Sequence, residues 1–86
     1  MQVRYRNKVV KSLARMDPRL RDRIVAKINA YAADPASMAN NVIALQGTSG
    51  YRLRVGNYRV LFDIEGDDAQ ILSVYKVAHR KEIYDG

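Results

Sequence analysis

The sequence contains no cysteine and no tryptophan, and it has a single histidine, His79. Without cysteine, thiol catalysis, cysteine-based zinc sites and a disulfide-stabilised secreted scaffold are excluded. One histidine is too few for a site with several histidine ligands, and we expect neither a metal nor a cofactor. No apolar run approaches the ~20 residues of a membrane-spanning helix, and no N-terminal apolar segment is typical of a signal peptide. We therefore expect a cytoplasmic protein without a membrane partner.

The charge of the chain is strongly positive and unevenly distributed. Its 86 residues, which predict a single domain over 1–86, carry a net charge of +6. Ten of the 15 cations are arginines, whose planar guanidinium groups bind phosphate through two parallel hydrogen bonds. Residues 1–43 hold the whole excess, whereas residues 44–86 carry six cations and six anions in separate groups. The positive charge of such a domain suits an anionic partner, which could be RNA, DNA, the ribosome, a membrane surface or an acidic protein.

The first half of the chain predicts one strand and two helices. Residues 2–6 alternate between apolar and cationic side chains, which predicts a short strand. Asn7 is a suitable N-cap for a helix that continues to about residue 16. Asp17 and Pro18 then form a second start signal, an acidic cap followed by proline at the first helical position. The second helix is predicted over 18–33, with its apolar stripe at Leu20, Ile24, Ile28 and Tyr31.

The second half predicts β-structure. Residues 36–50 are expected to form a loop with a short apolar interruption at 42–45, and strands follow over 51–55, 58–65 and 69–78. Gly56-Asn57 is a two-residue hairpin turn, and 79–86 is expected to be a polar tail or one helical turn. The order β-α-α-β-β-β predicts an α+β fold: an antiparallel sheet with both N-terminal helices packed on one face.

The two-residue turn fixes the register of the predicted hairpin. Its apolar face is directed towards the helices, and its other face carries three arginines, Arg52, Arg54 and Arg59. Like charges on neighbouring strands destabilise a sheet, and several guanidinium groups together suit a phosphate. The cluster therefore predicts an anion site. The alternative, equally compatible with the sequence, is a solvated polar face on which arginine serves solubility.

A second group of reactive side chains lies at the C-terminus: His79, Arg80 and Tyr84. Histidine exchanges protons near neutral pH, tyrosine can do so when cations lower its pKa, and arginine stabilises developing negative charge. The structural alternative is a histidine at a strand end and a tyrosine that docks a terminal turn. Lys76 and Lys81 add positive charge to this region and are further candidates for RNA or phosphate binding.

Two segments of this sequence resemble the RelE/ParE superfamily of toxins, in its RelE branch. The first is the hairpin Tyr-Arg-Leu-Arg-Val-Gly-Asn-Tyr-Arg-Val at 51–60, and the second is the ending His-Arg-Lys-Glu-Ile-Tyr at 79–84. The helix end at Asp34-Pro35 and the Leu-Gln-Gly approach at 45–47 are also similar. The resemblance covers essentially the whole chain and implies the toxin of a type II toxin–antitoxin system.

The resemblance also implies an activity, partners and residue roles. RelE-like toxins are ribosome-dependent, metal-independent endoribonucleases that cleave mRNA in the ribosomal A site and so inhibit translation. The 2′-hydroxyl attacks the adjacent phosphate, leaving a 2′,3′-cyclic phosphate and a 5′-hydroxyl. By position, Arg52 and Arg54 would hold the phosphate and help to activate the nucleophile, and Arg59 would stabilise the transition state. Near the C-terminus, Arg80 would support the leaving oxygen, and Tyr84 would stack on a base or act as general base. His79 matches a position at which family members carry a basic residue or histidine.

The implied partners are the ribosome with its mRNA and a cognate antitoxin, an acidic and partly disordered protein that also binds DNA. Two other functions fit the same fold. One is a ParE-like toxin that poisons DNA gyrase and has no RNase activity. The other is a non-catalytic RNA- or protein-binding module with a degenerate site.

Overall fold

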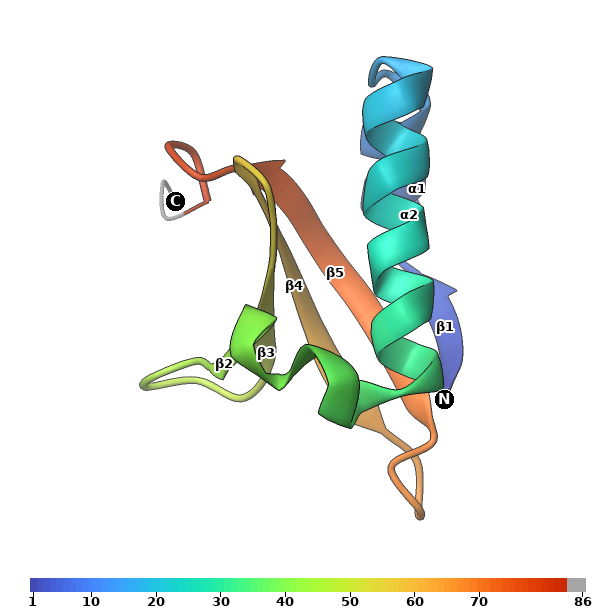
Figure 1. Ribbon diagram of the computed structural model, residues 1–86, viewed down its shortest axis with the longest axis vertical. Helices are drawn as coiled ribbons and strands as arrows, with labels where there is room; N and C mark the ends of the chain where they lie inside the picture. Colours follow the sequence, from blue (N-terminus) through green and yellow to red (C-terminus); the bar gives the residue numbers. More distant parts are fainter. Residues whose placement is uncertain (84–86) are drawn as a thin grey trace.

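A computed structural model of the protein describes residues 1–83 (Figure 1). Helix α2 spans Pro18–Ala33, as its sequence signals predict. The Asp17 carboxylate accepts a hydrogen bond from the Arg19 backbone N–H at 2.8 Å, which satisfies one donor of the first turn. The predicted apolar stripe faces the core, because Ile24, Ile28 and Tyr31 are all buried.

Helix α1 spans Asn7–Ala14, and its N-cap differs from the prediction by one residue. Asn7 lies inside the helix, and the cap position belongs to Arg6, whose extended backbone makes no side-chain capping bond. The Arg6 carbonyl accepts hydrogen bonds from the N–H groups of Val9 and Val10 at 2.9 and 3.0 Å. Arg6 also donates its N–H to the Val74 carbonyl at 3.0 Å, so pairing with the last strand fixes where the helix begins.

The sheet has five strands in the order β1-β5-β4-β3-β2. Their bounds are β1 Gln2–Tyr5, β2 Val42–Ala44, β3 Tyr51–Val55, β4 Tyr58–Glu65 and β5 Ile71–His79. The α+β class is confirmed, but the sheet is mixed, because β1 pairs with β5 in parallel. Hairpin turns impose antiparallel pairing only on strands that follow one another, whereas β1 reaches β5 from the other end of the chain.

Two other segments differ from the sequence prediction. The apolar interruption in the expected loop forms β2, which pairs antiparallel with β3, and residues 35–41 before it form a 3₁₀ segment. At the start of β5, Ala69 has a positive φ of 54° and donates its N–H to the Gly66 carbonyl. The turn after β4 therefore includes Ala69, and the strand begins two residues later than predicted.

Both helices lie on one side of the sheet, as predicted, and the core fills the space between them and the strands (Figure 1). Phe62 of β4 is fully buried, with its ring centroid 5.4 Å from that of Tyr31 and 5.5 Å from that of Tyr51. Within the described residues, 1–83, the opposite face of β2–β5 carries no helix (Figure 1). Within residues 1–83, none of the helices has the length and apolar character needed to cross a bilayer.

Candidate functional site

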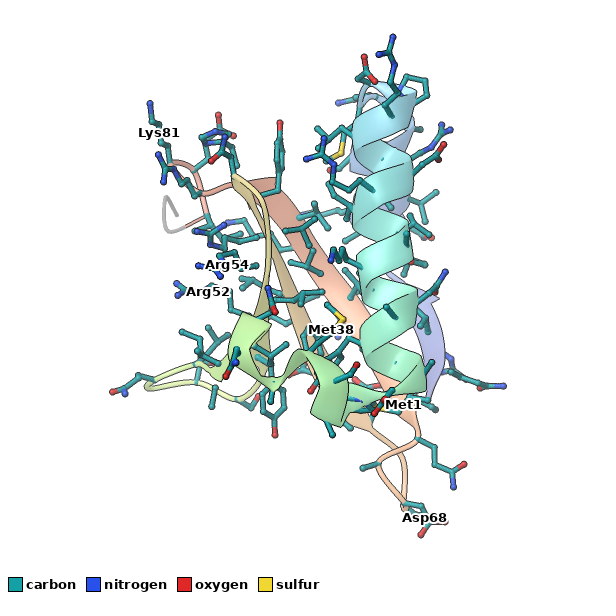
Figure 2. The ribbon with its side chains drawn as sticks, in the orientation of Figure 1. Met1, Met38, Arg52, Arg54, Asp68 and Lys81 are labelled. Atoms are coloured by element: carbon teal, nitrogen blue, oxygen red, sulfur yellow. The ribbon has the colours of Figure 1, made fainter. Side chains whose placement is uncertain are left out.

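The β3–β4 hairpin presents its arginines on the helix-free face, in the predicted register. Arg54 lies opposite Arg59, and Arg52 lies opposite Leu61. The turn between the strands uses Gly56 at a φ of +56°, a backbone conformation that costs glycine little. Figure 2 shows Arg52 and Arg54 pointing away from the helices. The register thus converts the alternation of the sequence into a cluster of cations on one surface.

The Arg59 guanidinium is held by the backbone of its own hairpin. Its Nη1 donates hydrogen bonds to the carbonyls of Gly56 and Tyr58, each at 2.9 Å. A guanidinium has five N–H donors, so these two bonds fix its plane and leave the Nε and Nη2 donors for a ligand. Such fixation lowers the conformational entropy that an arginine side chain loses when it binds an anion.

Arg80 joins the cluster from the end of β5. Its backbone N–H donates to the Asn57 carbonyl in the hairpin turn at 2.7 Å, which places residue 80 beside the turn. Partial burial lowers the pKa of Arg59, and the charges of Arg52, Arg54 and Arg80 lower it further. Four arginines from two distant segments therefore share one electrostatic environment. Within residues 1–83, no carboxylate forms an ion pair with Arg54, Arg59 or Arg80.

A small open pocket of about 160 Å³ lies at the cluster, lined by three arginines and by Asn40, Asn41 and Ile43. We call it the arginine pocket; its arginines are Arg52, Arg54 and Arg59. Sequence reasoning missed Asn40 and Asn41, because it placed them in a loop with no partner. Their position becomes evident only when β2 is recognised as a strand, since Ile43 then pairs with Arg52.

His79 lies apart from the arginine pocket. It pairs with Tyr58 in the sheet, and the two rings meet edge to face at a centroid distance of 5.4 Å. Because Ala78 pairs with Arg59, side chains alternate so that residue 79 is directed to the opposite, helix-covered face. Its Nδ1 accepts a hydrogen bond from the Lys81 N–H at 3.2 Å, so in the neutral ring the proton is on Nε2.

The remaining predicted cations flank the C-terminal turn. The N–H groups of Glu82 and Ile83 donate to the His79 carbonyl, and the buried Ile83 accepts a bond from Lys76 Nζ at 3.2 Å. Lys76 pairs with Leu61 and shares the face of the arginines, whereas Lys81 is exposed at the turn (Figure 2). Tyr84, predicted as a site residue, lies outside the described residues.

The arrangement suits the binding of an anion with several charged oxygens. Clustered guanidinium groups in a shallow, open pocket, one of them fixed by the backbone, can neutralise charge that develops on a phosphate. Arginine stays protonated at all practical pH values, so these side chains act by electrostatics and hydrogen bonding. Among residues 1–83, no three His, Cys, Asp or Glu side chains gather in a possible metal site.

A known protein family matches nearly the whole chain. A family model described as the ParE toxin of the type II toxin–antitoxin system parDE matches residues 3–84. No curated protein matches the chain.

Three solved structures containing RelE toxins share the fold. RelE in the RelE–RelB complex of Pyrococcus horikoshii OT3 is 25% identical, with a TM-score of 0.74 over 92% of this chain and 93% of that one. The Methanococcus jannaschii RelB–RelE complex gives 26% identity and a TM-score of 0.72 over 95% of each chain. The toxin in the intact RelBE complex of E. coli is 17% identical, with a TM-score of 0.67 over 91% of this chain and 94% of that one. At this identity the comparison shows likeness of fold alone. The family match over nearly the whole sequence, together with these structures, establishes that the chain belongs to the RelE/ParE superfamily of type II toxin–antitoxin toxins.

Proposed function

We propose that the protein is a ribosome-dependent endoribonuclease that cleaves mRNA in the ribosomal A site, without a metal ion, and so inhibits translation. The observation that carries the proposal is the convergence of Arg52, Arg54, Arg59 and Arg80 on one open face of the sheet. A pocket of clustered guanidinium groups is complementary to a phosphodiester that gains negative charge during reaction.

In the proposed reaction, the ribose 2′-oxygen loses its proton and forms a bond to the adjacent phosphorus. The bond from phosphorus to the 5′-oxygen breaks, and that oxygen takes up a proton. The products are a 2′,3′-cyclic phosphate and a 5′-hydroxyl. Because the nucleophile is a 2′-hydroxyl, DNA is not a substrate.

Each arginine has a role that follows from its position. Arg52 and Arg54 hold the non-bridging phosphate oxygens from β3. Arg59, fixed by two carbonyls, stabilises the added charge of the transition state. Arg80 supports the leaving oxygen from the end of β5. In this proposal Tyr84 stacks on a base or accepts the 2′-hydroxyl proton, as the family resemblance implies.

We assign the other predicted residues to supporting roles. His79 and Lys76 position the C-terminal turn, through the bonds to the Lys81 N–H and the Ile83 carbonyl. Lys81, exposed at that turn, contacts the RNA backbone. This differs from a direct proton-transfer role for His79, because the face that its side chain shares with Tyr58 is turned away from the arginine pocket.

The proposal includes neutralisation by a cognate antitoxin. Two of the RelE structures to which this chain is similar are complexes with RelB antitoxins. An acidic segment of such a protein would complement the +6 charge of this chain. By covering the arginine pocket it would exclude RNA from the site.

The decisive experiment is primer extension on a defined mRNA in a cell-free translation reaction with purified protein. Cuts within the A-site codon are expected for the wild type. Arg59→Ala is expected to reduce cleavage by at least about 100-fold, comparable to the loss of one donor from an oxyanion site. Arg19→Ala, which removes an exposed arginine from α2, is the matched control and should cleave normally.

Arg59 also bonds to its own hairpin, so a second variant separates chemistry from folding. Arg54→Ala removes the cation that lies opposite Arg59 and makes no side-chain hydrogen bond to the backbone within residues 1–83, and it should also reduce cleavage without lowering the melting temperature. Full cleavage by both variants would contradict the assigned site. Intact mRNA in the presence of folded wild-type protein would contradict the nuclease, and inhibition of DNA gyrase supercoiling would then identify the ParE-like alternative.

A further inference from the structure

A second cavity adjoins the arginine pocket on the same face of the sheet. It has a volume of about 390 Å³, and its lining includes Ile43, Leu45, Leu61 and Tyr75. Ile43 and Arg52 line both cavities, so they form the wall between them. Ile43 is half exposed, at 50%, so its side chain is accessible to a ligand on this face. We call this cavity the apolar pocket.

A β-bulge directs Tyr75 onto this face. Leu61 pairs with Lys76, but the next residue of β4, Phe62, pairs with Val74, so Tyr75 has no partner in the ladder. An extra residue of this kind changes the direction of a side chain, and bulges are common beside functional sites. Without the bulge, strict alternation would place residues 75 and 76 on opposite faces.

The Tyr75 side chain lies across the sheet rather than standing up from it. A Cβ built on Gly50, the residue before β3, would lie 3.4 Å from the Tyr75 hydroxyl oxygen and 2.9 Å from Asp63 Oδ1. The tyrosine starts on β5, so its side chain must pass over β4 to reach Gly50. It therefore extends over the helix-free face of the sheet, at the edge of the apolar pocket.

We propose that the apolar pocket is a nucleobase subsite, in which the base next to the phosphate in the arginine pocket stacks on Tyr75 and contacts Ile43 and Leu61. This rests on the proposed RNA-cleaving function and adds a determinant of substrate binding to it. Aromatic rings on an open sheet face are a general means of holding single-stranded bases, because every base has a π-face.

The shape and charge of the two pockets favour a nucleotide over a peptide. In a nucleotide the phosphate and the flat base are joined by a single sugar, and here an arginine pocket and an apolar pocket share Arg52 as a wall. A guanidinium at that boundary can pair with the phosphate and contact the face of the base. An aliphatic side chain of an acidic partner peptide is the competing occupant, and the test below decides between them.

The test uses RNA that cannot be cleaved, so it is independent of catalysis. A fluorescent 2′-O-methyl hexanucleotide and the same backbone without bases are titrated with protein, and anisotropy gives the ratio of their affinities. For the wild type the base-bearing oligonucleotide should bind at least about fivefold more tightly. Tyr75→Ala should lower the ratio markedly, because it removes one stacking surface, and Tyr75→Phe should preserve it.

A pair of half-exposed aliphatic residues provides a matched control. Ile43→Ser should lower the ratio without affecting folding, because Ile43 is half exposed. Val10→Ser changes a residue of equal exposure, 51%, on helix α1 and should leave the ratio unchanged. If Tyr75→Ala does not fold, the comparison of the affinity ratios of Ile43→Ser and Val10→Ser is sufficient to test the subsite.

The outcomes separate this inference from the proposed function. An unchanged affinity ratio in both Tyr75→Ala and Ile43→Ser would overturn the subsite even if mRNA is cleaved. The subsite would also be overturned if these variants lose affinity only for an acidic antitoxin peptide. A ratio that depends on Tyr75 and Ile43 would support the subsite even if primer extension showed no cleavage, and would then assign base-dependent RNA binding to a non-cleaving protein.

Discussion

Replacing Arg54 by threonine is expected to make the protein more stable and less active. Arg54 and Arg59 face each other directly across β3 and β4, and the charge of Arg54 contributes to the lowered pKa of Arg59. Like charges at directly opposed positions destabilise a sheet by roughly 0.2–1 kcal/mol. Threonine removes this repulsion and is favoured in strands.

The expected magnitude follows from the size of the chain. For a domain of this length, 1 kcal/mol changes the melting temperature by about 4–8 °C, so the repulsion corresponds to an increase of about 1–8 °C. Arg4→Thr corrects for strand propensity, because Arg4 is also exposed on a strand but lies opposite Ser73. The quantity of interest is therefore the difference in melting temperature between the two variants.

Salt provides the diagnostic measurement. The screening length falls from about 10 Å at 0.1 M salt to about 3 Å at 1 M, so the advantage of Arg54→Thr over Arg4→Thr should shrink by more than half at 1 M NaCl. Calorimetry or circular dichroism at both concentrations gives the answer. If Arg54→Thr is less stable than Arg4→Thr, or if their difference does not respond to salt, the arginines do not repel one another as their register indicates.

Two predictions concern the core. Phe62→Ala should lower the free energy of unfolding by about 3–5 kcal/mol, because it opens a cavity between Tyr31 and Tyr51; urea unfolding measures this, and a normal midpoint would show that the strand faces are assigned incorrectly. Tyr5→Phe should raise stability by about 1 kcal/mol, since the buried Tyr5 hydroxyl has no hydrogen-bond partner within residues 1–83. Burial raises the pKa of Tyr5 above 10.0, so its neutral form favours folding and wild-type stability should fall as the pH rises through about 10. A Tyr5→Phe protein that loses stability there as steeply as the wild type would contradict this assignment.

Local patterns in the sequence determined much of the fold and half of the candidate site. Asp17 and Pro18 define the start of α2 through capping chemistry that acts within a few residues. The Gly56-Asn57 turn sets the hairpin register, and strict alternation then places Arg52, Arg54 and Arg59 on one face. These features were predictable because neighbouring residues decide them.

Only the tertiary structure decided which distant segments meet. The parallel pairing of β1 with β5, and the strand β2 that brings Asn40 and Asn41 to the arginine pocket, depend on long-range contacts that no local pattern encodes. The bond from Arg80 to the Asn57 carbonyl likewise joins the end of β5 to the hairpin.

The positions of His79 and Tyr75 show the same distinction between what local sequence and what tertiary structure determines. In the sequence His79 stands beside Arg80, yet the pairing of β5 with β4 directs His79 to the helix-covered face, whereas the charge of Arg80, in the turn that follows, acts on Arg59 of the arginine cluster. Tyr75 would be read as an ordinary strand residue, but a bulge directs it onto the arginine face. A bulge relieves a mismatch between two strands, so its position is set by packing across the whole sheet and not by the residues beside it.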